Sequence, residues 1–198
     1  EGNISTIAGT GDSDYYGDGG LALDAAFRDP NSLASDQQGN IYVAEAANNR
    51  IRKIDTNGIV TTIAGNGEHA DSGDGGSALK AGIRSMDDIA FSPEGELHIL
   101  GTNTHKVRKI TKDGKIVTVA GKGDPGFFGD DGPAIKAMLK NPAAISFDSK
   151  GNLYIADMGN NRIRKVDTKG TITTFAGTGL FGWGRTGETV EIYLQNFP

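Results

Sequence analysis

The chain has 198 residues, a net charge of −5, and 30 glycines against 6 prolines, a composition that predicts a folded protein with many tight turns. It contains no cysteine, which excludes disulfide bonds and thiolate metal sites, and its acidic balance argues against nucleic acid as a partner. No apolar run approaches the roughly 18 residues of a membrane-spanning helix, so we expect no membrane span.

The sequence repeats itself at intervals of 56 residues. The run GNIYVAEAANNRIRKID begins at residue 39 and returns in related form at residues 95 and 151. The turn GDGG at 17–20 returns at 73–76 and, as GDDG, at 129–132. Self-similarity at such a period indicates a repeat architecture, in which each unit packs against its neighbours.

Each unit contains four short segments that are rich in β-branched residues and bounded by Gly, Asp or Asn, which predicts four strands. In the first unit they lie at 31–36, 41–45, 50–54 and 59–65, and the copies follow 56 and 112 residues later. The repeat units are therefore expected at about 31–66, 87–122 and 143–178. A stray fourth strand is expected at 3–9, and an atypical terminal repeat or cap at 179–198.

Four antiparallel strands with apolar residues on both faces suit a blade of a β-propeller, because a blade is covered on each side by another blade. We therefore predict that residues 1–198 form a single all-β propeller region. About 3.5 repeats leave the ring incomplete. Either the chain is a piece of a longer protein, or further copies of it complete the ring.

The runs GNLYIADMGNNRIRKVD and GTITTFAGTG resemble the NHL-repeat β-propellers, in particular the bacterial and teneurin-like form with GDGG inserts. This resemblance implies a ring of about six blades and a non-catalytic binding scaffold. Such a scaffold presents loops to a protein or carbohydrate partner, and an extracellular or periplasmic location is favoured. Some members of the family are enzymes. The alternative is therefore a lyase or lactonase with its site in the central channel, which could depend on a cation.

The motif NNRIRK predicts a charged pair at the turn between the second and third strands. Glu45 would pair with Arg50, and Asp157 with Arg162, because a hairpin brings each carboxylate close to its guanidinium. In the middle repeat both partners are replaced, by Gly101 and Lys106, as expected of a pair. In the alternative interpretation, the basic residues of the motif form a stripe that binds a polyanion.

Carboxylates spaced among glycines in the inserts are candidates for calcium, which takes 6–8 oxygen ligands. Calcium is the one cofactor that the sequence suggests. In the alternative interpretation, the aspartate of each GDGG accepts hydrogen bonds from the main chain of its own loop. The candidate ligands are Asp12, Asp14, Asp18, Asp74, Asp130 and Asp131.

The first strand of each repeat is expected to line the central channel. In the second repeat this strand carries Asp87 and Asp88, which are the candidates for a polar group in the channel. The three histidines, His69, His98 and His105, occupy unrelated positions in the repeat. They therefore do not predict a metal triad.

Overall fold

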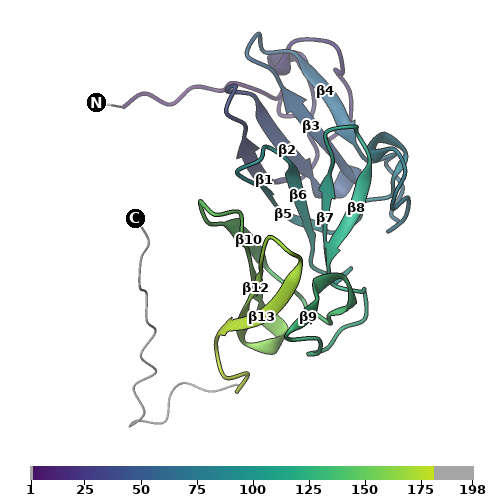
Figure 1. The fold of residues 1–198 in the computed structure, drawn as a ribbon. Coiled ribbons are helices and arrows are strands. Elements are labelled where there is room, and N and C mark those ends of the chain that lie inside the picture. Colours follow the sequence, from purple (N-terminus) through teal and green to yellow (C-terminus); the bar gives the residue numbers. More distant parts are fainter. Residues whose placement is uncertain (1, 181–198) are drawn as a thin grey trace.

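The fold was analysed in a computed structural model, which describes residues 2–180. Three antiparallel sheets follow one another along the chain, and each forms one blade (Figure 1). Every strand of the three blades begins and ends within about one residue of its predicted limits, so the predicted all-β fold is confirmed. Blade 1 contains β1 (Pro30–Ser35), β2 (Ile41–Glu45), β3 (Arg50–Ile54) and β4 (Val60–Ala64). Blade 2 contains β5 (Met86–Phe91), β6 (Leu97–Gly101), β7 (Lys106–Ile110) and β8 (Ile116–Ala120). Blade 3 contains β10 (Ala144–Phe147), β11 (Leu153–Asp157), β12 (Arg162–Val166) and β13 (Thr171–Ala176).

The helical content of the described residues is limited to single 3₁₀ turns, and none of them is long and apolar enough to cross a membrane. Two follow the second strand of a blade, and three lie in the inserts that precede the blades. The two turns that follow a second strand end at Asn49 and Asn161. Both residues have the left-handed backbone conformation, which Asn adopts more readily than most residues. The 3₁₀ turns are η1 (Ala22–Asp24), η2 (Ala46–Asn48), η3 (Ala78–Lys80), η4 (Ala134–Lys136) and η5 (Met158–Asn160).

The GDGG turn of each insert covers the outer edge of the blade that follows it. In blade 1 the amide of Gly19 donates to the carbonyl of Val60 (2.7 Å), and the amide of Val60 donates to Gly20 (3.0 Å). In blade 3 the same segment is the short strand β9 (Gly132–Pro133), which pairs with β13. The insert thus protects the last strand of each blade from unwanted edge pairing.

The first strand of each blade is innermost, because β5 lies beside β1 on one side and β10 on the other. Two equivalent apolar layers form between the blades. In each layer, three residues of one blade pack against three residues of the next blade. We call the first of these two surfaces the trailing face of its blade, and the second the leading face of its blade. The first layer joins Ala44, Ile51 and Ala64 to Ile89, Ile99 and Ile116. The second joins Leu100, Val107 and Ala120 to Ile145, Ile155 and Ile172.

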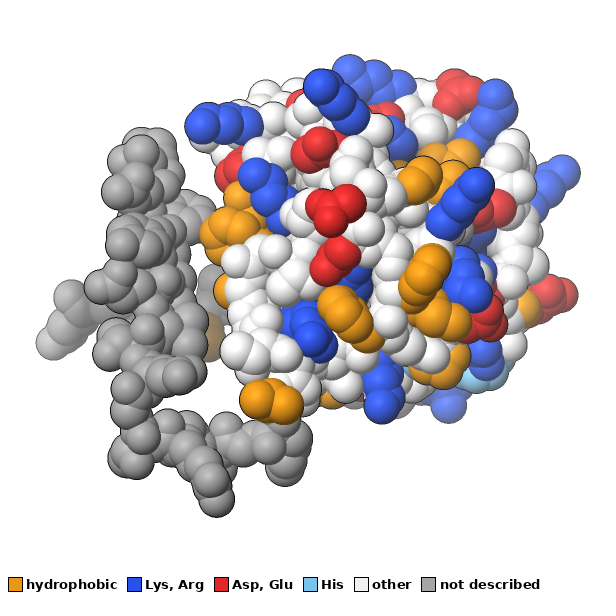
Figure 2. Space-filling model, turned by 60° about the horizontal axis from the view of Figure 1, so that its bottom comes forward, with side chains coloured by type: hydrophobic (Ala, Val, Ile, Leu, Met, Phe, Trp, Pro, Cys, Tyr) orange, Lys and Arg blue, Asp and Glu red, His pale blue; other side chains and the backbone are white. Residues whose placement is uncertain are grey.

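The outer faces of blades 1 and 3 carry no neighbouring blade among residues 2–180. Leu33 is 67% exposed, whereas Ile89 and Ile145 at the same repeat position are 3% and 7% exposed. Ile163 is 37% exposed, whereas Ile51 and Val107 are 0% exposed. Figure 2 turns the bottom of Figure 1, where blade 3 lies, toward the viewer and shows apolar side chains exposed among charged ones. The described sheets therefore form an open arc with an apolar face at each end.

The predicted strand at 3–9 is not present in the structure. This segment pairs with no strand, and Ile4 is fully exposed. A fourth strand needs the third strand of its own blade, and the described residues contain no such strand before it. Likeness to β4 in sequence therefore does not suffice to make a strand. The predicted cap at 179–198 lies almost wholly outside the described residues.

Candidate functional site at the channel mouth

The second arginine of NNRIRK, not the first, is the buried centre of each blade. Arg52 and Arg164 are fully buried, and Arg108 is almost so. The Nε of Arg52 lies 2.9 Å from Asp18, and its Nη1 lies 3.9 Å from Glu45. A buried guanidinium needs such partners, because removing its charge from water is otherwise very unfavourable.

The predicted pairing of Glu45 with Arg50 is therefore wrong in its partner. The two residues face each other across β2 and β3, but Arg50 is held elsewhere. Its guanidinium stacks on the ring of Tyr15, 4.0 Å from the centroid, and donates to the carbonyls of Asn48 and Asn66. Glu45 instead accepts from the amide of Arg28 (3.1 Å) and faces Arg52.

Blade 3 repeats this arrangement. The predicted partners Asp157 and Arg162 are opposite each other in the register, yet Asp157 lies 3.3 Å from Arg164. Arg164 also lies 2.7 Å from Asp130, and Arg162 stacks on Phe127 at 3.8 Å. The guanidinium of Arg162 donates to main-chain carbonyls, so the alternative of a free basic stripe has no support from this residue.

Blade 2 reaches the same charge balance by another route. Asp71 occupies the repeat position of Tyr15 and Phe127, and it pairs with Lys106 (2.7 Å) and Arg108 (3.3 Å). Asp74 supplies the second carboxylate, 2.7 Å from Arg108. Each buried arginine therefore faces two carboxylates, although the second acid comes from the insert in blade 2 and from the second strand in blades 1 and 3.

The GDGG aspartates are thus committed to the blade that follows them. Asp18 and Asp74 accept from the amides of Thr62 (3.1 Å) and Thr118 (2.9 Å) on the fourth strand. Asp130 accepts from the hydroxyl of Thr174 (2.6 Å). Burial alone would raise the pKa of Asp130, but the Thr174 hydroxyl and the Arg164 guanidinium lower it below its usual value. The alternative in which these carboxylates serve their own loop is wrong.

The remaining calcium candidates do not come together with these aspartates. Asp12 accepts from the hydroxyl of Tyr16 (2.8 Å), and Asp14 from the amide of Tyr15 (2.8 Å). Asp131 lies in the left-handed region, with φ of 63°. Within residues 2–180, no three His, Asp or Glu side chains gather as a metal site would require. Calcium binding therefore stays a prediction, and the described loops contribute no preformed site to it.

The inner-strand candidates have different surroundings. Asp88 lies between all three inner strands: it accepts from Ser32 (3.0 Å) on β1 and from the amide of Ile145 (2.8 Å) on β10. Asp87 accepts from the amide of Thr102 (3.1 Å) and is exposed. Asp88 thus links the three blades at the axis, whereas Asp87 points to the end of the blade opposite the β1–β2 turn.

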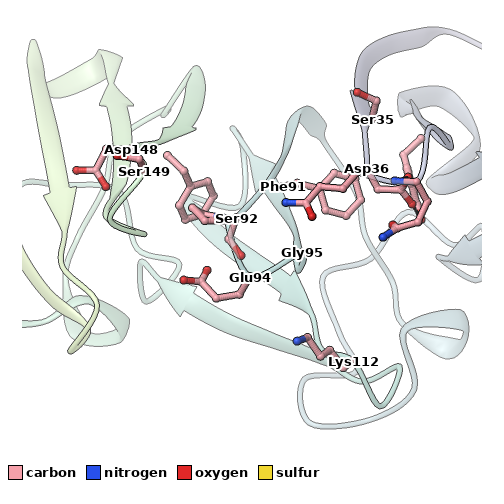
Figure 3. A pocket seen from close by; sticks show the side chains of 14 residues that line it. Ser35, Asp36, Phe91, Ser92, Glu94, Gly95, Lys112, Asp148 and Ser149 are labelled. Carbon is pink, nitrogen blue, oxygen red and sulfur yellow. Dashed lines mark hydrogen bonds between the residues drawn. The ribbon is translucent and has the colours of Figure 1, made fainter. Parts of the chain in front are cut away.

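A cavity of about 680 Å³ lies where the turns after β1, β5 and β10 meet (Figure 3). We call it the channel mouth. Asp36 borders it but has no free acceptor, since it receives bonds from the amides of Gln38 and Asn40, from the Asn40 side chain and from Tyr42. Asp148 is bonded in the same way within its own turn. These two carboxylates therefore shape the turns.

Four other polar side chains at the mouth have no such bonds in the described part of the chain. Gln37, Gln38, Lys112 and Ser149 are exposed at its rim. Glu94 is also exposed, and its own amide and the Ser92 hydroxyl lower its pKa. Ser92 stands at the repeat position of Asp36, so blade 2 breaks the pattern of its neighbours here. The sequence analysis missed this mouth, although the exchange of Asp for Ser within a repeated turn was the available signal.

The histidines do not converge. His98 is buried beside the mouth, and its Nδ1 lies 3.0 Å from the carbonyl oxygen of Glu96. Burial lowers the pKa of His98 to about 4, so the imidazole is neutral at pH 7. The Nδ1 of His105 accepts from the amide of Asn141 (3.2 Å), and His69 is exposed in an insert.

A family model described as the teneurin NHL domain matches residues 2–74 and 122–182, which together are more than half of the chain. The chain belongs to the teneurin NHL family. Teneurin-m of Drosophila melanogaster is 32% identical over 181 residues, covering 84% of this chain and 6% of that protein. The chain thus spans a small part of the curated teneurins that it matches. The unmatched stretch, 75–121, holds the whole of blade 2, where the acid of the second strand is replaced by Gly101.

Solved structures confirm the propeller fold of this NHL chain. An auxiliary nutrient binding protein from Bacteroides ovatus superposes with a TM-score of 0.58 at 21% identity, over 79% of this chain and 38% of that one. A virginiamycin B lyase from Staphylococcus aureus gives a TM-score of 0.51 at 21% identity, over 78% and 46% of the two chains. At such identities the likeness concerns the fold alone.

Proposed function

We propose that the chain is part of an extracellular NHL binding scaffold whose contact surface is the channel mouth. The observation that carries this proposal is the sorting of polar groups there. The carboxylates Asp36 and Asp148 are saturated by their own turns, whereas amide groups of blade 1, charged groups of blade 2 and a hydroxyl of blade 3 are exposed at the rim. Such a surface suits recognition more than acid–base chemistry.

A protein is the proposed partner. The rim offers long, flexible side chains of both charges over an open cavity, which suits a polar protein loop. Membership of the teneurin NHL family also supports a protein-interaction role. Binding to a glycan is the outcome that would change this assignment, and lyase or lactonase activity would require groups other than the saturated Asp36 and Asp148.

The test uses a biotinylated probe of the 198-residue chain on arrays of cell-surface ectodomains and of glycans. The mouth variant Gln38→Ala/Glu94→Ala/Lys112→Ala removes one amide, one acid and one base. The control Asn103→Ala/Asp124→Ala/Lys122→Ala removes the same three kinds of group from the opposite end of blade 2 and the insert that follows it. We expect ectodomain binding that the mouth variant loses and the control keeps. Equal loss in both variants, or binding to glycans alone, would refute the proposal.

A further inference from the structure

The seam between blades 2 and 3 is built differently from the seam between blades 1 and 2. On the trailing face of blade 1, the ring of Tyr42 packs edge-on against Phe91 of blade 2, with centroids 4.8 Å apart. Its hydroxyl donates to Asp36 (3.0 Å), as does the side chain of Asn40 (2.7 Å). We call Asp36, Asn40 and Tyr42 the turn triad. Its tyrosine packs on the apolar layer of the first seam, beside the channel mouth.

Blade 2 has exchanged all three members of this triad. Blade 3 keeps them as Asp148, Asn152 and Tyr154, whereas the same positions of blade 2 hold Ser92, Glu96 and His98. Glu96 pairs with Lys109 (2.6 Å) instead. Serine is shorter than aspartate and histidine is shorter than tyrosine, so Ser92 and His98 do not meet as Asp36 and Tyr42 do. The exchange therefore leaves space in the second seam.

That space is a cavity of about 560 Å³, which we call the seam pocket. It shares Ser92, Glu94 and Phe147 with the channel mouth, so the pocket continues from the mouth into the seam (Figure 3). Leu153 and Val166 of blade 3 give it an apolar wall. A side chain that enters from the mouth would thus meet a polar entrance and an apolar interior.

His98 provides the pocket with an acceptor that has no partner. The side chain is 6% exposed and lines the pocket. Its Nδ1 lies 3.0 Å from the carbonyl oxygen of Glu96, so Nδ1 carries the hydrogen and Nε2 carries a lone pair. Within residues 2–180, Nε2 has no hydrogen-bond partner. A nearly buried acceptor of this kind is stabilised by any ligand that brings a donor to it.

The charges around the pocket favour a cation. Glu96 and Lys109 neutralise each other. Glu94 forms no ion pair with the described residues, and it reaches toward blade 3, since a Cβ added to Gly151 would lie 3.0 Å from its Oε1. The turn after β12 adds one charge of each sign, from Asp167 and Lys169. Glu94 is therefore the one carboxylate of the pocket whose charge is not balanced by the other groups that line it.

We propose that the seam pocket binds a guanidinium group, carried by an arginine side chain that a protein partner inserts from the channel mouth. The group would donate to Nε2 of His98 and to the carboxylate of Glu94, while its aliphatic stem packs on the apolar wall. A guanidinium suits this pair because it has five donors in a fork and no acceptor. That the arginine belongs to a protein rests on the proposed function, whereas the preference of the pocket for a cation does not.

The first experiment titrates the 198-residue chain with Nα-acetyl-arginine amide and follows the imidazole nitrogens by ¹⁵N NMR. The Nε2 signal of His98 should move, and the signals of His69 and His105 should stay. The matched probe is Nα-acetyl-citrulline amide, in which a neutral urea replaces the guanidinium. It should bind about tenfold more weakly, because hydrogen bonds between charged groups are the stronger ones. Equal binding of the two probes, or tighter binding of the lysine analogue, would overturn the proposal.

Two variants separate binding from folding. Glu94→Gln changes an exposed side chain and keeps its shape, so it should lower the affinity for the arginine probe and leave that for the citrulline probe unchanged. Ser92→Asp/Glu96→Asn/His98→Tyr gives blade 2 the turn triad of its neighbours. This triad graft should fold normally, as judged by its Tm, and lose the arginine probe. A graft that folds and still binds the probe would place the site elsewhere and refute the proposal.

The ectodomain array distinguishes the pocket from the proposed function. The triad graft should also lose the bound ectodomain, although it keeps Gln38, Glu94 and Lys112 at the rim. Ectodomain binding that survives in the graft would overturn the assignment to a partner's arginine. A chain that binds the arginine probe at His98 but no ectodomain would refute the proposed function and support the cation site.

Discussion

The strongest test of the blade's charged centre is a pair of double-mutant cycles on Asp157. This carboxylate is fully buried and accepts from the amide of Lys140 (2.7 Å), the side chain of Asn160 (2.8 Å) and Arg164 (3.3 Å). Asp157→Asn keeps the shape but removes the charge. The side-chain NH₂ group of the new asparagine is itself a donor, so it cannot accept the hydrogen bonds that one of the carboxylate oxygens accepted.

The expected loss follows from these contacts. Removing one partner of a buried ion pair typically costs 3–5 kcal/mol. Arg164 keeps Asp130 at 2.7 Å, so we expect the lower end, about 3 kcal/mol of unfolding free energy. For a chain of this size, that is a fall in Tm of about 6–12 °C.

The cycle then identifies the partner of Asp157. Combining Asp157→Asn with Arg164→Met should recover about 1–3 kcal/mol relative to the sum of the single changes, because the buried charge is also removed. Combining it with Arg162→Met should be additive within about 0.5 kcal/mol. Guanidinium unfolding monitored by circular dichroism measures all five variants. Coupling to Arg162 and none to Arg164 would refute the assignment.

Three further predictions concern single sites. The pKa of His98 is lowered to about 4 from 6.5, so its contribution to stability is complete above pH 6.5 and is lost as the pH falls toward 4. Blades 1 and 3 have tyrosine at this position. The unfolding free energy of the His98→Tyr variant should therefore fall by about 2–3 kcal/mol less than that of the wild type between pH 6.5 and pH 4. An unchanged pH profile of Tm would count against this prediction. Phe127→Ala should lower the unfolding free energy by about 1–2 kcal/mol, because two guanidinium groups stack on this ring. Phe128→Ala, at a more exposed ring, should leave the unfolding free energy nearly unchanged. Equal losses for the two variants in urea unfolding would contradict this prediction. Gly121→Ala places a Cβ against the carbonyl of His105 at a φ of 81°, so it should destabilise the fold by at least 2 kcal/mol more than Gly58→Ala, which has a similar φ and open space; equal thermal shifts would exclude the clash.

The strands were predictable because turn-forming residues mark their ends in every copy of the repeat. Gly, Asp or Asn bounds most of the strands, and three aligned copies remove the ambiguity that a single short apolar run would leave. The segment at 3–9 shows the limit of this reasoning. A strand is made by its hydrogen-bonding neighbour, and that neighbour cannot be read from the segment itself.

The charged centre was predictable only in part. Arg50 was predicted as the partner of Glu45 because the two residues are opposite each other across a hairpin. A long side chain can instead contact an aromatic ring or a main-chain carbonyl, as that of Arg50 does. The useful signal was that Arg52, Arg108 and Arg164 are identical in all three units, whereas the first basic position changes to Lys106. The free rim of the channel mouth could not be predicted, because it depends on which polar groups are already satisfied.

The shared arginine centre also decides where one repeat can be cut from another. Arg108 draws its two acids from the insert that precedes β5, so the portable module begins after β4 and runs from 65 to 120, not from 86 to 120. A chimaera joined at the sheet boundary would place the Tyr15 type of insert next to the Gly101 type of hairpin, leaving Arg108 a single counter-charge. Engineers who shuffle such blades should therefore move insert and sheet as one piece.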